Sequence, residues 1–389
     1  MAPLLSKIFP RTPVISDGGL GTTLENDFHV DISNTPLWSS RAVVEQPDVM
    51  IQAHLAFLRA GAQLILTSTY QSSFSTFYRS GYKKDEAIAI MRKSVQLANE
   101  ARKIFIDSAR PAGSHDVRIG LSLGAFGASL GIAHEFDGYY PPPYGPRAYT
   151  EGDNLNSYSP DETEQEQASV DALALFHFER VEVFLSDRET WGQIDCLAFE
   201  TIPLVREIRA IRKAMGMVEA RITQDGLGLE SKPWWIEAVF PDGVYPETLP
   251  RAEGTRLGVA DVAAAALRDD GLLPAPSGFG INCTAMEHVR ALVPQVTNTV
   301  KELHLPQKPW LVVYPNGGDV YDAVTQTWMT SDTRSVIEKR EEWVQNMECI
   351  VKDIEGEVPW GGIIVGGCCR TNHEDVERLC SILKPEITP

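Results

Sequence analysis

The sequence is short of cysteine and of long apolar runs, and each shortage excludes a class of protein. Its 389 residues include 6 cysteines, two of them adjacent (Cys368 and Cys369), which does not suit a disulfide framework. No apolar run reaches the roughly 18 residues that a membrane-spanning helix needs. The apolar stretch after Met1 is too short for a secretory signal. We therefore expect a cytoplasmic protein with reduced thiols and no membrane partner.

Positive charge is scarce as well. Acidic residues outnumber basic ones 53 to 35, which gives a formal net charge of -18. A surface this negative repels phosphate backbones and anionic lipids, so we expect no nucleic-acid partner. The composition is otherwise ordinary, 43% hydrophobic and 23% charged, and this excludes a disordered or fibrous protein.

Short apolar segments recur along the chain, and each is followed by a segment with helical periodicity. Several are apolar at consecutive positions, which is typical of strands covered on both faces. The expected strands are Val14–Gly18, Leu64–Tyr70, Ile119–Gly124, Cys196–Thr201, Trp234–Phe240, Gly278–Thr284, Trp310–Asn316 and Gly362–Cys368. Strict alternation of strand and helix favours an α/β protein with a closed (β/α)8 TIM barrel over a doubly wound open sheet.

The segments between the strands predict amphipathic helices. The first has Pro47 near its start, Ile51, Leu55 and Leu58 on one face, and Gly61 just past its end. The other helices are expected at about 84–107, 163–187, 204–218, 258–269, 286–303, 334–354 and 373–383.

The remaining length is assigned to loops of a single domain that spans residues 1–389. Residues 134–167 form the clearest insertion, and their acidic, Ser/Asn-rich stretch is one that we expect no core to use. Because this insertion follows the third strand, it should lie on the C-terminal face of the barrel, either disordered or as a lid. Minor elaborations are expected at about 219–232 and 240–257.

Three cysteines stand at the ends of two expected strands. Cys283 ends the sixth strand, and Cys368 and Cys369 end the eighth. In a barrel these ends lie close together on the catalytic face, and a strand end that turns into a helix can direct two neighbouring sulfurs to one point. Zinc prefers soft sulfur ligands, and three of them leave a fourth tetrahedral position for substrate. The alternative is that all three are small buried residues.

The residues around the adjacent cysteines predict how the turn is built. Gly366 and Gly367 should supply its backbone freedom. The motif Thr371-x-x-Glu374 resembles a capping box that opens the last helix, whose N-terminal partial charge favours nearby thiolates. His288 and His373 are possible further ligands, although we expect surface or capping roles for both.

Taken together, these segments resemble the homocysteine S-methyltransferases. The motifs that carry the likeness are Asp17-Gly-Gly-Leu-Gly-Thr-Thr-Leu, Ala60-Gly-Ala, Thr69-Tyr-Gln, Phe199-Glu-Thr-Ile-Pro, Gly280-Ile-Asn-Cys, Val313-Tyr-Pro-Asn-Gly-Gly and Gly366-Gly-Cys-Cys-Arg-Thr. The resemblance implies one zinc ion per chain, held by Cys283, Cys368 and Cys369. It also implies methyl transfer to the thiol of homocysteine, giving methionine. The run from Tyr314 to Trp328 looks closest to the branch that uses S-methylmethionine or S-adenosylmethionine as donor.

The resemblance also implies that carboxylates hold the amino-acid substrate. Glu200 ends the fourth expected strand, where it could bind the ammonium group of homocysteine; a helix-capping role before Pro203 is the alternative. Asp17 ends the first strand, with a turn-forming role as its alternative. The substrate-binding candidates are Asp17, Glu200, Thr69 and Asn316.

A sulfonium donor is positively charged, which suits aromatic faces. Trp38, Tyr70 and Phe126 follow the first three strands and are the candidates for a donor cage, although each alone is more often a core residue. The same chemistry would serve another thiol or a selenol such as selenocysteine. A metal-dependent hydrolase and a barrel that keeps zinc for structure are the other possibilities. The sequence lacks the His- and Asp-rich strand ends that a hydrolase needs, and it leaves the donor and the oligomeric state open.

Overall fold

Eight parallel strands form the central sheet. They are β1 (Val14–Ile15), β2 (Leu64–Leu66), β3 (Arg118–Gly124), β4 (Cys196–Ile202), β5 (Trp234–Ala238), β6 (Gly278–Asn282), β7 (Trp310–Tyr314) and β10 (Ile363–Val365). The structure is a computed structural model that describes residues 4–32, 35–108, 117–131, 133–152, 154–224, 228–249, 255–269, 271–318, 320–322, 327–329, 334–355 and 359–384.

The sheet closes into a barrel. Its strand order is β1-β10-β7-β6-β5-β4-β3-β2, so β1 and β2 are its two ends. A single parallel bridge between Ser16 and Leu64 joins these ends, and two backbone hydrogen bonds support it, from Gln63 N to Ile15 O at 2.7 Å and from Asp17 N to Leu64 O at 3.0 Å. The predicted (β/α)8 barrel is confirmed.

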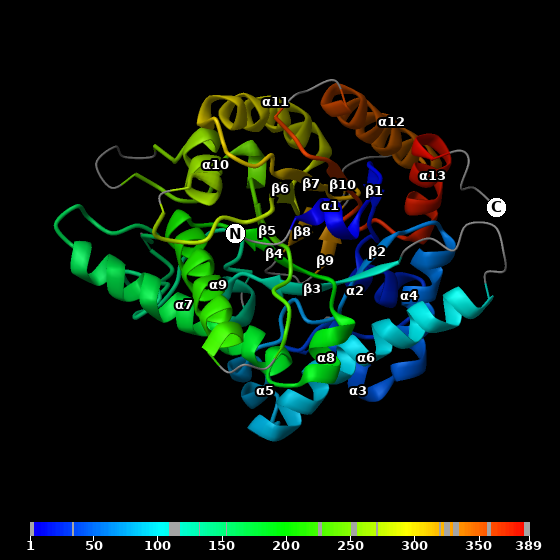
Figure 1. Cartoon of the computed structure of the whole chain (residues 1–389), viewed down its shortest axis with the longest axis horizontal. Coiled ribbons are helices and arrows are strands. Elements are labelled where there is room, and N and C mark those ends of the chain that lie inside the picture. Colours follow the sequence, from blue (N-terminus) through cyan, green and yellow to red (C-terminus); the bar gives the residue numbers. More distant parts are fainter. Residues whose placement is uncertain are drawn as a thin grey trace.

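Helices surround the ring of strands on its outside (Figure 1). Those that follow the barrel strands and were expected from the sequence are α4 (Pro47–Arg59), α6 (Lys84–Ser108), α7 (Thr163–Leu185), α9 (Val205–Gln224), α10 (Val259–Leu267), α11 (Met286–Leu303), α12 (Val336–Glu355) and α13 (His373–Leu383). Short helices that the periodicity did not reveal are α1 (Leu5–Ile8), α2 (Leu20–Asn26), α3 (Ser39–Glu45), α5 (Phe74–Arg79) and α8 (Arg188–Gln193), together with the 3-10 turns η1 (Phe126–Ser129) and η2 (Pro241–Gly243).

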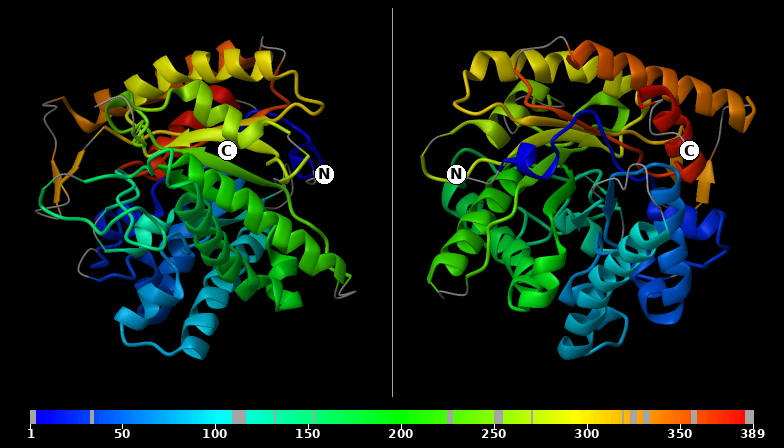
Figure 2. Two further views of the ribbon diagram at one scale, coloured as in Figure 1. Left: turned by 90° about the vertical axis from the view of Figure 1, so that its left-hand side faces the viewer. Right: turned by 45° about the vertical axis from the view of Figure 1, so that its right-hand side comes forward.

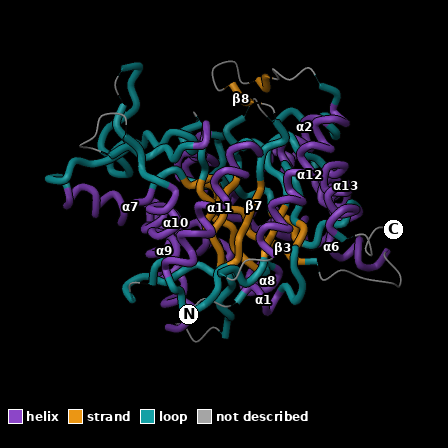
Figure 3. Tube along the Cα trace, turned by 90° about the horizontal axis from the view of Figure 1, so that it is seen from above, coloured by secondary structure: helices purple, strands orange, loops and turns teal. Residues whose placement is uncertain are grey.

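Helix α1 covers one end of the barrel. Leu5 and the neighbouring Phe9 are buried in a cluster with side chains that fill the barrel interior, among them Trp235 and Trp310. The hairpin of β8 (Val320–Asp322) and β9 (Thr327–Met329) lies at the opposite end (Figures 2 and 3). Because α1 covers the N-terminal end of the strands, the other end is the one left for a site.

Several strands are shorter than the sequence predicts, and at the end of β2 a side chain takes the place of the backbone ladder. The Asp17 carboxylate accepts a hydrogen bond from Leu66 N at 2.7 Å, where a parallel neighbour would offer a carbonyl oxygen. Residues 67–70 and 366–368, expected as strand, lie outside the strands, although Thr67 N still donates to Gly120 O at 3.0 Å and Gly366 N to Val313 O at 3.1 Å.

The loops differ from expectation in three places. Residues 219–224 belong to α9 and are not an elaboration. The β8–β9 hairpin was not foreseen. The acidic, Ser/Asn-rich stretch is mostly exposed, as expected, but it is anchored at one point. Asn156 is 1% exposed, and its side chain donates to the carbonyl oxygens of Asp137 and Pro246, both at 2.8 Å. Residues 240–257 hold η2 and an isolated bridge between Thr248 and Arg256, apart from 250–254, which lie outside the described residues.

No helix in the described part of the chain combines the length and the apolar character that crossing a lipid bilayer requires.

Burial of a histidine in α4 predicts acid sensitivity. His54 is fully buried, neither of its ring nitrogens has a hydrogen-bond partner, and burial lowers its pKa from 6.5 to about 4. Between these two pKa values, His54 binds a proton in the unfolded chain but not in the folded chain. Folding stability is therefore lost as pH falls through 6.5. This histidine should cost roughly 2 kcal/mol of folding stability at pH 5.

His54→Leu should accordingly flatten the loss of stability between pH 7 and pH 5, measured by urea unfolding at each pH. The exposed His304, changed to Asn, is the matched control and should leave the pH dependence as it is. Equal slopes for His54→Leu and the unaltered protein would contradict the account.

Candidate functional site

A cavity of about 420 Å³ opens at the C-terminal end of the barrel strands. Its walls come from the ends of β1, β2, β3, β4, β7 and β10, from the turn after β6, and from the loops that follow β1 and β3. The lining residues used below are Asp17, Trp38, Tyr70, Ser122, Glu135, Glu200, Cys283, Tyr314, Cys368 and Cys369.

Three cysteine sulfurs converge in this cavity. The Sγ atoms of Cys283, Cys368 and Cys369 all lie within 4.8 Å of one another, and those of Cys283 and Cys369 are 4.0 Å apart. Tetrahedral bonds of about 2.3 Å from zinc to sulfur would place ligand sulfurs about 3.8 Å apart. The cluster is thus close to the geometry that a tetrahedral metal with thiolate ligands requires. Among the described residues, no fourth His, Cys, Asp or Glu joins the group.

A strained backbone directs the first of these sulfurs. Cys283 has a φ of 46°, in the left-handed region that residues other than glycine rarely adopt. Two neighbours hold the conformation: Asn282 Nδ2 donates to Thr201 Oγ1 at 2.9 Å, and Asn282 Oδ1 accepts from Thr201 N at 2.8 Å. These two bonds join the ends of β4 and β6. Sequence reasoning missed Asn282, because a strand-end asparagine carries no signal of this partner 81 residues away.

The adjacent cysteines begin a tight turn that ends at Thr371, and the two glycines before them leave space for close neighbours. Gly366 and Gly367 do not have positive φ, so the prediction that they give backbone freedom is wrong. A Cβ atom on Gly366 would lie 2.7 Å from Asp17 O, and one on Gly367 would overlap the Thr371 hydroxyl. That hydroxyl donates to Cys368 O at 2.6 Å and fixes the turn.

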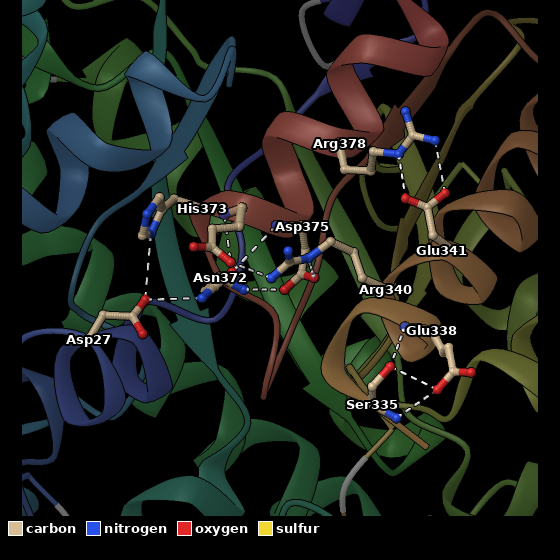
Figure 4. A network of polar contacts seen from close by, with 10 residues as sticks. Asp27, Ser335, Glu338, Arg340, Glu341, Asn372, His373, Asp375 and Arg378 are labelled. Atoms are coloured by element: carbon tan, nitrogen blue, oxygen red, sulfur yellow. Dashed lines mark hydrogen bonds and ion pairs between the residues drawn. The ribbon is translucent and has the colours of Figure 1, made fainter.

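The last helix is capped one residue later than predicted (Figure 4). Asn372 is the N-cap of α13, and Asp375 completes the capping box, so the motif Thr371-x-x-Glu374 is not the cap. Arg340 of α12 donates to Asp375 at 2.8 Å. The N-terminus of α13 is thereby tied to its neighbour in the barrel.

Neither histidine near the cysteines in sequence belongs to the cluster. His373 points away toward α2, with its Nδ1 3.5 Å from Asp27 Oδ2. His288 lies 3.8 Å from Glu287 and packs beside Gly243. Both histidines are half-buried outside the cluster, and neither is the N-cap of its helix.

The three thiols share their protons. Hydrogen bonds to the other two sulfurs, followed by burial, raise the pKa of Cys283. The hydrogen bonds that Cys283 and Cys368 donate to Cys369 lower the pKa of the latter thiol. Metal binding at these sulfurs must release the protons that the thiols hold.

Two buried carboxyl groups flank Cys368. Burial raises the pKa of Asp17 to about 7, and burial, followed by the charge of Cys368, raises the pKa of Glu200 to about 8. Glu200 Oε1 has no hydrogen-bond partner. A cation bound here would restore the ionised form of Glu200. The surroundings of Glu200 therefore suit the binding of an ammonium group better than the helix-capping role.

The other predicted site residues divide into two groups. Trp38 and Tyr70 line the cavity, whereas Thr69, Phe126 and Asn316 are not among its lining residues. Thr69 is fully buried and donates to Ser122 O at 2.7 Å, so its hydroxyl is used to hold strand ends.

Phe126 belongs to a separate aromatic cluster, with ring centroids 3.9 Å from Tyr144 and 5.0 Å from Phe176. It therefore cannot join Trp38 and Tyr70 around one ligand. Asn316 N donates to Thr284 O at 3.0 Å, which joins the turns after β6 and β7.

Glu135 lines the cavity but was not a predicted site residue. It opens the insertion after η1, and burial raises its pKa to about 7. In the sequence, Glu135 is only one of several acidic residues expected on loops of the C-terminal face. Nothing in the sequence distinguishes it from the others.

Comparisons with known proteins agree with this geometry. A family model described as Homocysteine S-methyltransferase matches residues 14–383. Homocysteine S-methyltransferase 3 of Arabidopsis thaliana is 27% identical over 382 residues, which cover 96% of this chain and 90% of the relative. Selenocysteine methyltransferase of Astragalus bisulcatus is 28% identical over 399 residues, which cover 97% and 94%.

Among solved structures, the metallated form of the homocysteine methyltransferase MmuM from Escherichia coli matches with a TM-score of 0.66 at 24% identity. The match covers 98% of this chain and 99% of that one. It supports the barrel fold.

The close approach at Gly367 predicts that an added methyl group displaces the cysteine turn. Gly367→Ala should cost about 1–3 kcal/mol of stability, because a Cβ atom there overlaps Thr371. It should also weaken binding of cobalt(II), followed by the absorption of its thiolate complex. Gly192→Ala, in helix α8 with no atom within 4 Å of the added carbon, is the matched control. Equal behaviour of the two variants would show that the turn is not tightly packed.

Proposed function

The chain belongs to the homocysteine S-methyltransferase family, and from that premise we propose that it transfers a methyl group from a sulfonium donor to homocysteine, with zinc at the three cysteines. S-methylmethionine and S-adenosylmethionine are the proposed donors, and methionine is the product. The observation that carries the proposal is the convergence of three sulfurs within 4.8 Å in a cavity at the mouth of the barrel.

The donor set fits zinc. Three soft thiolates select a metal such as zinc over magnesium or calcium, which prefer oxygen. With no fourth protein ligand among the described residues, one tetrahedral position is left for a substrate. Zinc bound here would supply the deprotonation of a thiol that otherwise has a pKa near 8.5.

The chain's own residues would position the acceptor. The Glu200 carboxyl group, whose Oε1 has no hydrogen-bond partner, lines the same cavity as Asp17 and Cys368. An ammonium group bound there would direct the acceptor thiol toward the cysteines. Because the acceptor carries both groups on one short chain, this contact fixes the direction of its sulfur.

The transfer itself needs no acid or base from the protein. A lone pair of the acceptor sulfur forms the new bond to the methyl carbon. The old carbon–sulfur bond breaks with its electron pair staying on the donor, which leaves as a neutral thioether. Attack must be in line, so alignment of the two sulfurs is the task left to the cavity. Trp38 and Tyr70 line the cavity and suit a cationic donor.

A second acceptor is supported by one observation. The relative from Astragalus bisulcatus, 28% identical and matched over 97% of this chain, is a selenocysteine methyltransferase. A selenol acceptor carries the same ammonium group and would use the same three sulfurs.

The decisive assay is incubation of the zinc-loaded protein with homocysteine and each sulfonium donor in turn, measuring methionine. Selenocysteine in place of homocysteine tests the second acceptor. Methionine formed from neither donor would contradict the proposed function.

Metal binding should depend on the three cysteines. We expect about one zinc per chain in the unaltered protein and loss of most of it in the Cys283→Ser, Cys368→Ser double variant, measured by elemental analysis. Cys349→Ser removes an exposed thiol outside the cluster and should leave the zinc content as it is. Full zinc occupancy in the double variant would show that the zinc binds at another site.

Removal of the Glu200 charge should change the KM for the acceptor and not the KM for the donor. Loss of one charge-assisted hydrogen bond is worth roughly 1.5–3 kcal/mol, so Glu200→Gln should raise the KM for homocysteine about 10- to 150-fold. Zinc content and the donor KM should stay normal. Glu151→Gln, on the exposed surface, serves as the control. If steady-state kinetics give an unchanged acceptor KM, Glu200 has a structural role.

A further inference from the structure

Glu135 is a buried carboxyl group that the proposed chemistry has not yet used. It is 8% exposed and lines the cavity. The carboxyl interacts with its own backbone N–H, and Oε2 has no hydrogen-bond partner. An ionisable group in this state costs folding free energy, which a bound cation would recover.

The backbone around Glu135 is held firmly. Phe136 N donates to Ala133 O at 3.1 Å, and Gly138 N donates to His134 O at 2.8 Å. This turn packs so closely on η1 that Gly127 has no room for a side chain. The neighbouring His134 is paired with Asp137 at 2.9 Å, so its ring is already engaged. The backbone that carries the Glu135 carboxyl group is therefore held in place at the cavity.

Three carboxyl groups lie near the cysteine cluster. Asp17 and Glu200 interact electrostatically with Cys368, and Glu135 interacts with Cys369. The hydroxyl of Tyr70 interacts with Glu135 and, more weakly, with Glu200. Among the described residues that line the cavity there is no lysine, arginine or histidine. The lining of the cavity therefore favours cationic ligands.

We propose that Glu135, with Trp38 and Tyr70, binds the positive charge of the methyl donor and makes this cavity selective for cationic S-methyl donors. The inference rests on the proposed function, which assigns the other carboxyl position to the acceptor ammonium. In-line transfer needs the donor on the far side of the acceptor sulfur. Glu135 comes from the loop after η1, whereas Asp17 and Glu200 come from the ends of β1 and β4. A carboxylate next to an aromatic wall recognises a sulfonium by charge and by contact with the ring face.

The kinetic test separates the two substrates. Glu135→Gln should raise the KM for S-methylmethionine about tenfold or more and leave the KM for homocysteine as it is. Glu135→Asp, which keeps the charge, should lie closer to the unaltered protein. Asp161→Asn, at an exposed position of the same insertion, should change neither constant.

A binding test needs no turnover. Calorimetry of the zinc-loaded protein compares S-methylmethionine, whose sulfur is positively charged, with methionine, whose sulfur is neutral. The unaltered protein should prefer S-methylmethionine, and Glu135→Gln should lose about tenfold of that preference. Melting curves establish that the variants fold. If Glu135→Gln does not fold, Glu135→Leu, which also removes the charge, carries the test.

The outcomes distinguish the inference from the function. Methionine formation with an unchanged donor KM in Glu135→Gln would overturn the inference alone. So would an equal rise of both KM values, because that is the result of a structural role. A protein that makes no methionine from either donor would contradict the proposed function, and the calorimetric preference would still decide the role of Glu135.

Discussion

The functional end of this barrel depends on bringing three sulfur atoms within 4.8 Å of one another. The cost is visible in the backbone. Cys283 adopts a left-handed conformation, and the hydrogen bonds between Asn282 and Thr201 hold it. The segment before Cys368 leaves no room for side chains at Gly366 and Gly367. A site of small apolar packing residues would need none of this, so the local strain itself argues for a ligand.

Charge is the second organising feature. The described lining residues include carboxyl groups and no basic side chain, and burial raises the pKa of Asp17 and Glu135 to about 7 and that of Glu200 to about 8. Near neutral pH these carboxyl groups are therefore partly protonated, and a cation bound beside them would favour their ionised forms. An acceptor with an ammonium group and a sulfonium donor together supply the positive charges that such a cavity lacks.

The sequence predicts most of the barrel and all three cysteines of the cluster, because strand periodicity and strand-end positions are local signals. It does not predict what depends on contacts between distant segments. Phe126 and Glu135 both follow the third strand, yet packing against α7 places the first in an aromatic cluster and leaves the second in the cavity. The Asp17 carboxylate shortens β2 through a bond that spans 49 residues. The cap at Asn372 differs from the predicted one because Thr371 is engaged with Cys368.

The central claim is that the acceptor thiol is activated at the metal held by these cysteines. X-ray absorption at the zinc edge, with and without homocysteine, tests it most directly. The account predicts a change from three sulfur ligands and one lighter atom to four sulfur ligands when homocysteine binds. A zinc shell that stays the same at saturating homocysteine would contradict it and leave the three cysteines as a structural site.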